Sequence, residues 1–151
     1  MKSNQIIVFT FFIALAIVAI ESCKKETKIS STGKTKSHNI GKNCMDCHKK
    51  RGDGEGIFTA AGTVYDSVKT NVLPNVTLKL FTGPNGTGDV KYTIPVDGLG
   101  NFYTTETISY GSGLYPAIVG ATTTKFMISS ITTGQCNGCH GVTTAKIWAK
   151  Q

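Results

Sequence analysis

Two pentapeptides of the chain repeat one arrangement of residues that can bind a cofactor covalently. Residues 44–48 (CMDCH) and residues 136–140 (CNGCH) both read C-x-x-C-H. The two-residue gap lets both thiols reach the vinyl groups on one edge of a porphyrin and form thioethers, and the histidine that follows can bind the iron. The two motifs therefore predict two covalently attached haems c, held by Cys44, Cys47, Cys136 and Cys139, with His48 and His140 as iron ligands.

Paired cysteines also serve three other purposes. Two C-x-x-C pairs can hold a structural zinc ion, but a zinc site does not explain the histidine after each pair or the long stretch between the pairs. Two local disulfides suit an oxidising compartment, but they too leave the histidines without a role. A thioredoxin-like redox motif needs a βαβ pattern around it, which neither pair has.

One further histidine and one methionine are candidates for the second axial position of each iron. His38 precedes the first motif and Met127 precedes the second, whereas Met1 belongs to the N-terminal signal and Met45 lies inside an attachment loop. We therefore predict His/His ligation at the first haem and His/Met ligation at the second, where a thioether would raise the potential. The alternatives are a core position for Met127 and a solvated position for His38 in a polar, basic segment.

The N-terminal segment predicts export and anchoring to a membrane. Residues 6–20 are apolar except for Thr10, which is short for a membrane span and typical of the core of a signal peptide. The small Ser22 directly before Cys23, after this apolar stretch, resembles the signal of bacterial lipoproteins. The resemblance implies removal of residues 1–22, lipidation of Cys23 and a tethered protein on the periplasmic or outer-surface side of the cell envelope. The alternative is an uncleaved anchor with an incidental cysteine.

The net charge of +7 is unevenly distributed along the chain. Most of the excess lies in residues 24–51, which contain no Phe, Trp or Tyr. Because nucleic-acid-binding surfaces combine basic residues with interleaved aromatic ones, we expect no nucleic-acid partner. We interpret residues 23–40 as a basic, solvated linker, which can also attract anionic headgroups or an acidic redox partner.

The composition and the pattern between the motifs predict a mainly β fold. The 151 residues include 17 Gly and only 17% charged residues, which argues against a helical bundle, while 40% hydrophobic residues can support a core. Alternating or apolar runs predict strands at residues 60–65, 76–81, 90–94, 101–107, 114–122 and 125–130. Short strands separated by Gly-, Pro- and Asn-rich turns are typical of an antiparallel β-sandwich or barrel.

These patterns divide the chain into segments. We assign residues 57–131 to the sandwich, residues 41–56 to the first haem-attachment segment and residues 132–151 to the second. Helix is expected only around the attachment sites and over residues 143–150, where Trp148 can pack on a haem or on the sandwich.

The strand and turn residues also carry a family resemblance. Residues 61–66 (AGTVYD), 74–78 (PNVTL) and 100–103 (GNFY) are similar to carboxypeptidase-regulatory-like domains. Those are transthyretin-like β-sandwiches, which are common in secreted bacterial proteins as structural or binding modules. The resemblance covers about residues 57–130 and implies a scaffold, but a fold does not by itself define a function.

No catalytic constellation competes with the haem motifs. Asp89, Asp97 and Glu106 lie in or beside predicted turns, where solvated roles are usual. Residues 83–88 are rich in glycine but lack the lysine and the following helix of a phosphate-binding loop.

The sequence therefore predicts an electron carrier and not an enzyme. We expect an exported, membrane-anchored dihaem c-type cytochrome that exchanges single electrons with redox partner proteins at the cell envelope. One alternative is a haem-bearing binding or sensor module whose sandwich recognises a ligand, with weak peroxidase-like chemistry if a haem is five-coordinate. Another is a structural lipoprotein with disulfides.

Overall fold

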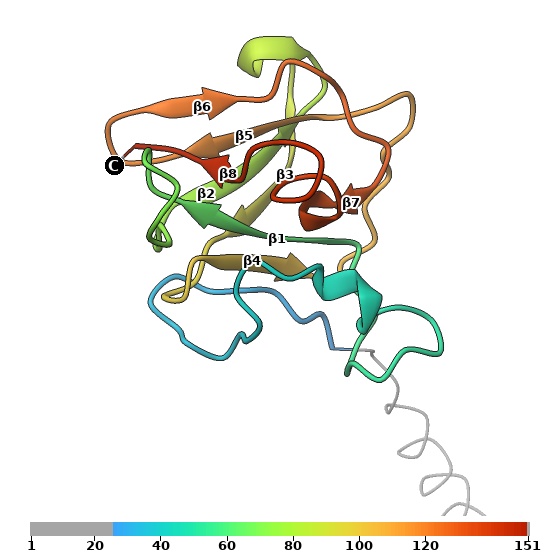
Figure 1. Cartoon of the computed structure of the whole chain (residues 1–151). Helices are drawn as coiled ribbons and strands as arrows, with labels where there is room; N and C mark the ends of the chain where they lie inside the picture. Colours follow the sequence, from blue (N-terminus) through green and yellow to red (C-terminus); the bar gives the residue numbers. More distant parts are fainter. Residues whose placement is uncertain (1–25, 151) are drawn as a thin grey trace, which may run out of the picture.

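The computed structural model describes residues 26–150 (Figure 1). The predicted signal peptide and the predicted lipidation site Cys23 lie outside the described residues. Within residues 26–150, no helix has the length and apolar character that a membrane crossing requires. The described chain forms two β-sheets joined by loops and short 3-10 turns, so the predicted mainly β, sandwich-like class is confirmed.

The first sheet is built around β1 (Ala60–Tyr65), which is buried along its whole length. On one edge it pairs antiparallel with β4 (Asn101–Thr104). On its other edge β1 pairs in parallel with β7 (Gly134–Gln135) and then with β8 (Ile147–Trp148). Because both edges of β1 are paired, it is the central strand of this sheet.

The second sheet is antiparallel throughout and has the strand order β3-β2-β5-β6. Its members are β2 (Thr77–Phe81), β3 (Val90–Pro95), β5 (Tyr115–Val119) and β6 (Thr124–Phe126). In β2 the burial alternates with the sequence: Leu78 and Leu80 are buried, and Lys79 between them is partly exposed. This period of two is the signature of a strand with one face on the core.

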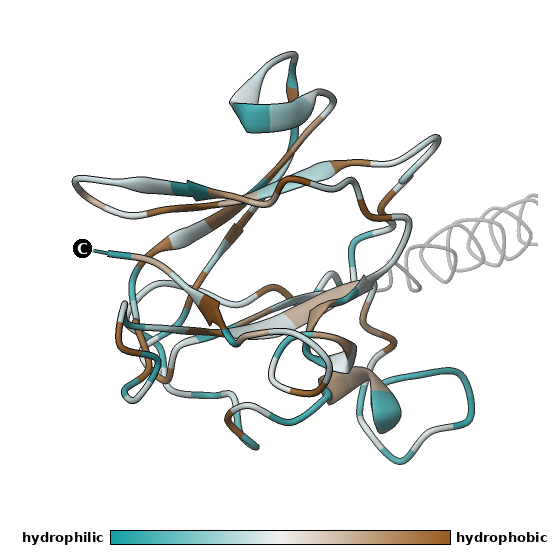
Figure 2. Cartoon of the chain, turned by 45° about the horizontal axis from the view of Figure 1, so that its top comes forward, coloured by the Kyte–Doolittle hydropathy of each residue, from teal (hydrophilic) through white to brown (hydrophobic). Residues whose placement is uncertain are grey.

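The hydrophobic core lies between the two sheets, which Figure 2 shows as separate layers. Val64 and Phe102 from the first sheet and Leu80 and Ile94 from the second are at most 1% exposed. Burying a side chain of this size contributes about 1.5–3 kcal/mol. Gly62 in β1 is required to be small, since a Cβ atom there would lie 2.5 Å from the Phe102 ring.

The predicted strands are confirmed, although several are shorter than expected, and the predicted C-terminal helix is wrong. Within residues 143–150 the chain instead forms β8, and Ala149 is fully buried with its N–H donating to Tyr65 O at 3.1 Å. A helix of two turns has little stability of its own. Pairing with the edge of β1 opposite β4 satisfies the backbone and buries Ala149. This tertiary contact is therefore favoured over a short helix.

The segments predicted on either side of the sandwich also contact its sheets. Ser30, expected in a solvated linker, is 1% exposed, and its N–H donates to Tyr103 O at 3.0 Å while its Oγ donates to Pro95 O at 2.6 Å. This part of the chain therefore packs against β4. At the other end, β7 and β8 make the second attachment segment part of the first sheet, through parallel pairing that the antiparallel prediction did not include.

Candidate haem-attachment sites

The two C-x-x-C-H motifs fold into the same local turn. The first attachment turn is a 3-10 turn at Cys44–Asp46, and the second attachment turn is one at Cys136–Gly138. In each, the histidine N–H donates to the carbonyl of the first cysteine at 3.0 Å. The second cysteine has nearly the same backbone angles in both, φ −99° and ψ −41° at Cys47 and φ −110° and ψ −50° at Cys139. Two thiols and an imidazole thus leave the backbone within one short turn at each site.

Each motif histidine is also held by a backbone carbonyl from the loop that follows it. His48 Nδ1 lies 3.1 Å from Glu55 O, and His140 Nδ1 lies 2.7 Å from Ala145 O. With Nδ1 as the donor, Nε2 carries the free lone pair, which is the arrangement found in metal-binding histidines. The loop after His48 comes so close that a Cβ atom at Gly54 would lie 2.7 Å from the imidazole, so this position requires glycine.

The first site is built from aromatic rings on the outer side of β4. The His48 ring is 8% exposed and stacks on Phe58 at 3.9 Å, and Phe58 stacks in turn on Tyr103 at 4.9 Å. The exposed ring of His38 lies 5.9 Å from that of His48 and is tilted by 34°. The structure therefore brings both histidines predicted for the first haem together.

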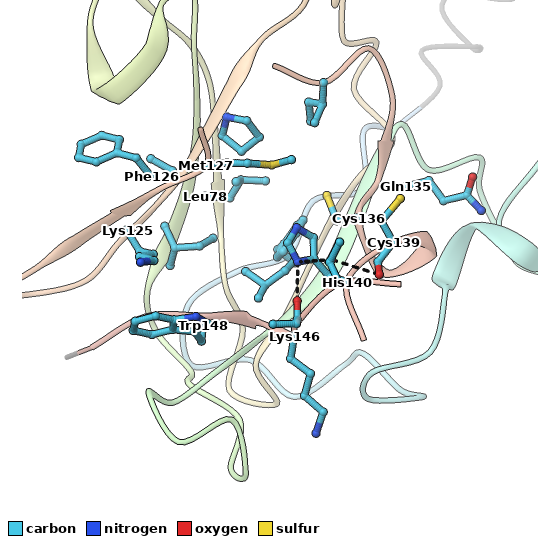
Figure 3. A pocket seen from close by; sticks show the side chains of 18 of the residues that line it. Leu78, Lys125, Phe126, Met127, Gln135, Cys136, Cys139, His140, Lys146 and Trp148 are labelled. Atoms are coloured by element: carbon cyan, nitrogen blue, oxygen red, sulfur yellow. Dashed lines mark hydrogen bonds between the residues drawn. The ribbon is translucent and has the colours of Figure 1, made fainter. Parts of the chain in front are cut away.

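The second site opens into an apolar pocket between the two sheets, which we call the inter-sheet pocket (Figure 3). It has a volume of about 320 Å³, within the range of small-ligand pockets. Leu78, Phe102 and Ile118 line it from the core. Met127 and His140 also line it, and Figure 3 shows them approaching from opposite sides.

The four described cysteines are free thiols. Burial raises the pKa of the Cys136 thiol to about 12, and the neighbouring Cys44 adds to this increase. Burial also raises the pKa of Cys44. Over residues 26–150, no group of three or more His, Cys, Asp and Glu side chains converges as the ligands of a metal ion would, so the four-cysteine zinc arrangement considered above is not seen there.

A buried polar cluster, formed by Thr63, Asn101 and Asn137, connects the two attachment turns. The Asn137 amide accepts from Thr63 N–H at 3.1 Å and donates to Lys42 O at 3.0 Å and to Thr63 Oγ1 at 3.1 Å. Thr63 Oγ1 also accepts from Gly41 N–H at 2.9 Å and donates to Asn101 Oδ1 at 2.6 Å. Lys42 and Gly41 directly precede the first motif, whereas Asn137 lies inside the second.

Comparison with models of protein families found no match, and neither the search of curated proteins nor the search of solved structures found a similar protein. A cofactor can therefore be inferred only from the residues of this chain. Covalent haem needs two thiols, an imidazole with Nε2 free and an apolar surface for the porphyrin. The residues of the second site meet all of these needs, and those of the first site offer the same donors beside the Phe58 ring.

The predicted site residues fall into two groups in the structure. Cys44, Cys47, His48 and His38 belong to the first site, and Cys136, Cys139, His140 and Met127 to the second. Sequence reasoning missed Phe58 and the polar cluster. The available signals were an asparagine inside the second C-x-x-C-H motif and a Thr and an Asn at buried strand positions. None of them indicates a partner by itself.

Proposed function

We propose that the protein is an exported, membrane-anchored dihaem c-type cytochrome that carries single electrons at the cell envelope. One observation carries the proposal: both C-x-x-C-H motifs close the same turn, and both histidines use Nδ1 on a backbone carbonyl, leaving Nε2 for iron. A bound haem supplies the one-electron chemistry of its iron. The chain anchors the porphyrins through its cysteines, orients the imidazoles and controls the access of solvent.

The second axial position of the first iron is assigned to His38. Its ring lies 5.9 Å from that of His48, a separation at which two imidazoles can share one metal between them. Asn101 Nδ2 donates to the His38 carbonyl at 3.3 Å, so the backbone of this exposed residue is tied to the buried polar cluster. That attachment supports a defined position for the ring and not a freely solvated one.

The second axial position of the second iron is assigned to Met127. It is partly buried, its N–H donates to Pro116 O at 2.9 Å, and it lines the same pocket as His140. A thioether ligand and an apolar site both raise the potential of a haem. The second haem is therefore expected to have the higher potential of the two.

The location and the partner follow from charge and from the N-terminal segment. Lipidation at Cys23 would tether the chain to the membrane. The exposed lysines that precede the first motif, such as Lys34, Lys36 and Lys42, would attract an acidic redox partner to that side of the molecule. Electron exchange with such a partner is expected to slow as ionic strength increases, because salt screens exposed charges.

A reductive titration with carbon monoxide tests the carrier function. On protein matured with a haem-attachment system, two reversible one-electron steps are expected, and carbon monoxide should leave the spectrum of the reduced protein unchanged because both irons are six-coordinate. Rapid and complete carbon monoxide binding would contradict the carrier proposal and favour a sensor or a peroxidase-like site. The single-haem variants described below identify which iron responds.

A further inference from the structure

The two attachment turns are far apart in the sequence but lie against the same strand. Asn137 Nδ2 donates to Lys42 O, which is 95 residues away in the sequence. Thr63 in β1 bonds both to Asn137 and to Gly41, the residue before Lys42. The second attachment turn also packs directly on β1, since a Cβ atom at Gly62 would lie 3.1 Å from Cys136 Cβ. The sandwich does not hold its two C-x-x-C-H motifs at opposite ends.

The connection between the turns is rigid because its polar atoms are buried and paired. Thr63 is 0%, Asn101 1% and Asn137 4% exposed. Both side-chain atoms of the Asn137 amide have protein partners. In a low-dielectric interior, a fully paired network of this kind favours one arrangement of its members, since each broken bond leaves a buried group unsatisfied.

The cluster also reaches the candidate distal ligand of the first haem. Asn101 Nδ2 donates to Ser37 Oγ at 3.0 Å and to His38 O at 3.3 Å. A single set of hydrogen bonds thus runs from the second attachment turn, through Thr63 and Asn101, to residues 37–38 and 41–42, which precede the first motif. A displacement of one turn would be transmitted to the other.

We infer that Asn137 is a positioning residue that holds the two attachment turns together, so that the two haems form one coupled pair instead of two independent centres. This inference depends on the proposed function, because it requires haem at both motifs. It adds that reduction of one iron changes the potential of the other, since charges separated by a partly buried, low-dielectric region interact strongly. Two oxidised irons in one pair are also expected to interact magnetically.

The test compares the matured two-haem protein with its single-haem variants. Cys44→Ala/Cys47→Ala removes the first haem, and Cys136→Ala/Cys139→Ala removes the second. For a coupled pair, the electron paramagnetic resonance spectrum of the oxidised protein should differ from the sum of the two single-haem spectra, and each potential should shift when the other haem is absent. A spectrum equal to that sum, with unshifted potentials, would overturn the coupling.

The role of Asn137 is tested in the same protein by two substitutions. Asn137→Leu removes all three side-chain bonds, and Asn137→Asp keeps an acceptor for Thr63 N–H but cannot donate to Lys42 O. Both variants, with two haems verified by mass spectrometry, should move the spectrum and the potentials towards the single-haem sum. Native-like coupling in either variant would overturn the role of Asn137.

The control substitution and a failure of the proposed function can each be distinguished from a loss of coupling. Asn71→Leu removes an exposed amide whose side chain bonds only to Asp66 in the same loop, and it should leave the coupling as in the native protein. The comparison of native and single-haem proteins decides the coupling even where an Asn137 variant does not accumulate. If the proposed function is wrong, the native protein binds no covalent haem at all, which mass spectrometry reports before any coupling is measured.

Discussion

The imidazole of His48 lies face to face with the ring of Phe58, with 3.9 Å between the ring centroids and 6° between the ring planes. The Nδ1 atom of the same imidazole is 3.1 Å from Glu55 O. The stack fixes the plane of the ring, and the hydrogen bond fixes its rotation within that plane. Two weak interactions thus hold Nε2 in one direction before any iron is bound.

The first prediction concerns this stack. Phe58→Leu keeps an apolar side chain but removes the flat surface, so the His48 ring gains freedom and the fold loses about 1 kcal/mol of stacking and packing energy. We expect the paramagnetic signal of the first haem to broaden, measured in the Cys136→Ala/Cys139→Ala variant that keeps only this haem. Phe126→Leu, a ring beside the inter-sheet pocket, is the control and should leave the first haem's signal as it is. Equal broadening in Phe58→Leu and in the Phe126→Leu control would argue against this account.

The second prediction concerns the thioether of Met127. Met127→Leu is nearly conservative in volume and is expected to cost less than about 1.5 kcal/mol in stability. It should abolish the methionine–iron band in the magnetic circular dichroism spectrum and lower the potential of the second haem. Met45→Leu, inside the first attachment turn, should keep the band. If the native protein lacks the band, Met127 is a packing residue and the assignment fails.

The third prediction concerns Thr63. Its hydroxyl takes part in three hydrogen bonds in a fully buried position. Thr63→Val leaves the partner groups unsatisfied, and we expect a loss of about 2–4 kcal/mol in the free energy of unfolding. Denaturant unfolding at matched haem content measures this loss. Thr93→Val, at an exposed position of β3, is the control and should change stability by less than about 0.5 kcal/mol. A loss in Thr63→Val no larger than that of the control would show that the polar cluster does not stabilise the fold.

The fourth prediction uses Trp148, the only tryptophan of the chain. Its side chain lines the inter-sheet pocket together with His140, and the ammonium groups of Lys125 and Lys69 lie 4.3 Å and 5.6 Å from its ring. A haem in this pocket should quench the indole emission by energy transfer. Loss of the second haem in Cys136→Ala/Cys139→Ala should raise the emission more than loss of the first haem, because energy transfer falls steeply with distance. The opposite order would place the second haem outside the pocket.

The strands were predictable because their signal is local. In residues 76–81 the apolar residues alternate, and Leu78 and Leu80 are buried as that period requires. The C-terminal segment was not predictable in the same way. Ile147 and Trp148 form a two-residue strand only because they meet Val64 and Tyr65, which are distant in the sequence. Local composition suggested a helix here, but pairing with the edge of the buried strand β1 is more favourable.

The C-x-x-C-H residues can be recognised in the sequence, but the mutual position of the two motifs could not be predicted from it. The spacing C-x-x-C-H implies the chemistry of each motif, whereas nothing in either pentapeptide indicates that the two turns meet. That information lies in Asn137, Thr63 and Asn101, which become partners only through the folding of β1 beside β4 and β7. The contact of the segment before the first motif with β4 was unpredictable for a related reason, since the polar Ser30 is buried by hydrogen bonds to the backbone and not by hydrophobicity.

The most direct test of the account is the mass of the intact protein after maturation with a haem-attachment system, combined with a pyridine haemochrome assay. The account predicts a covalent mass increase of two haems, one haem in Cys44→Ala/Cys47→Ala and in Cys136→Ala/Cys139→Ala, and none when all four cysteines are replaced. A colourless native protein with the mass of the polypeptide alone would contradict it.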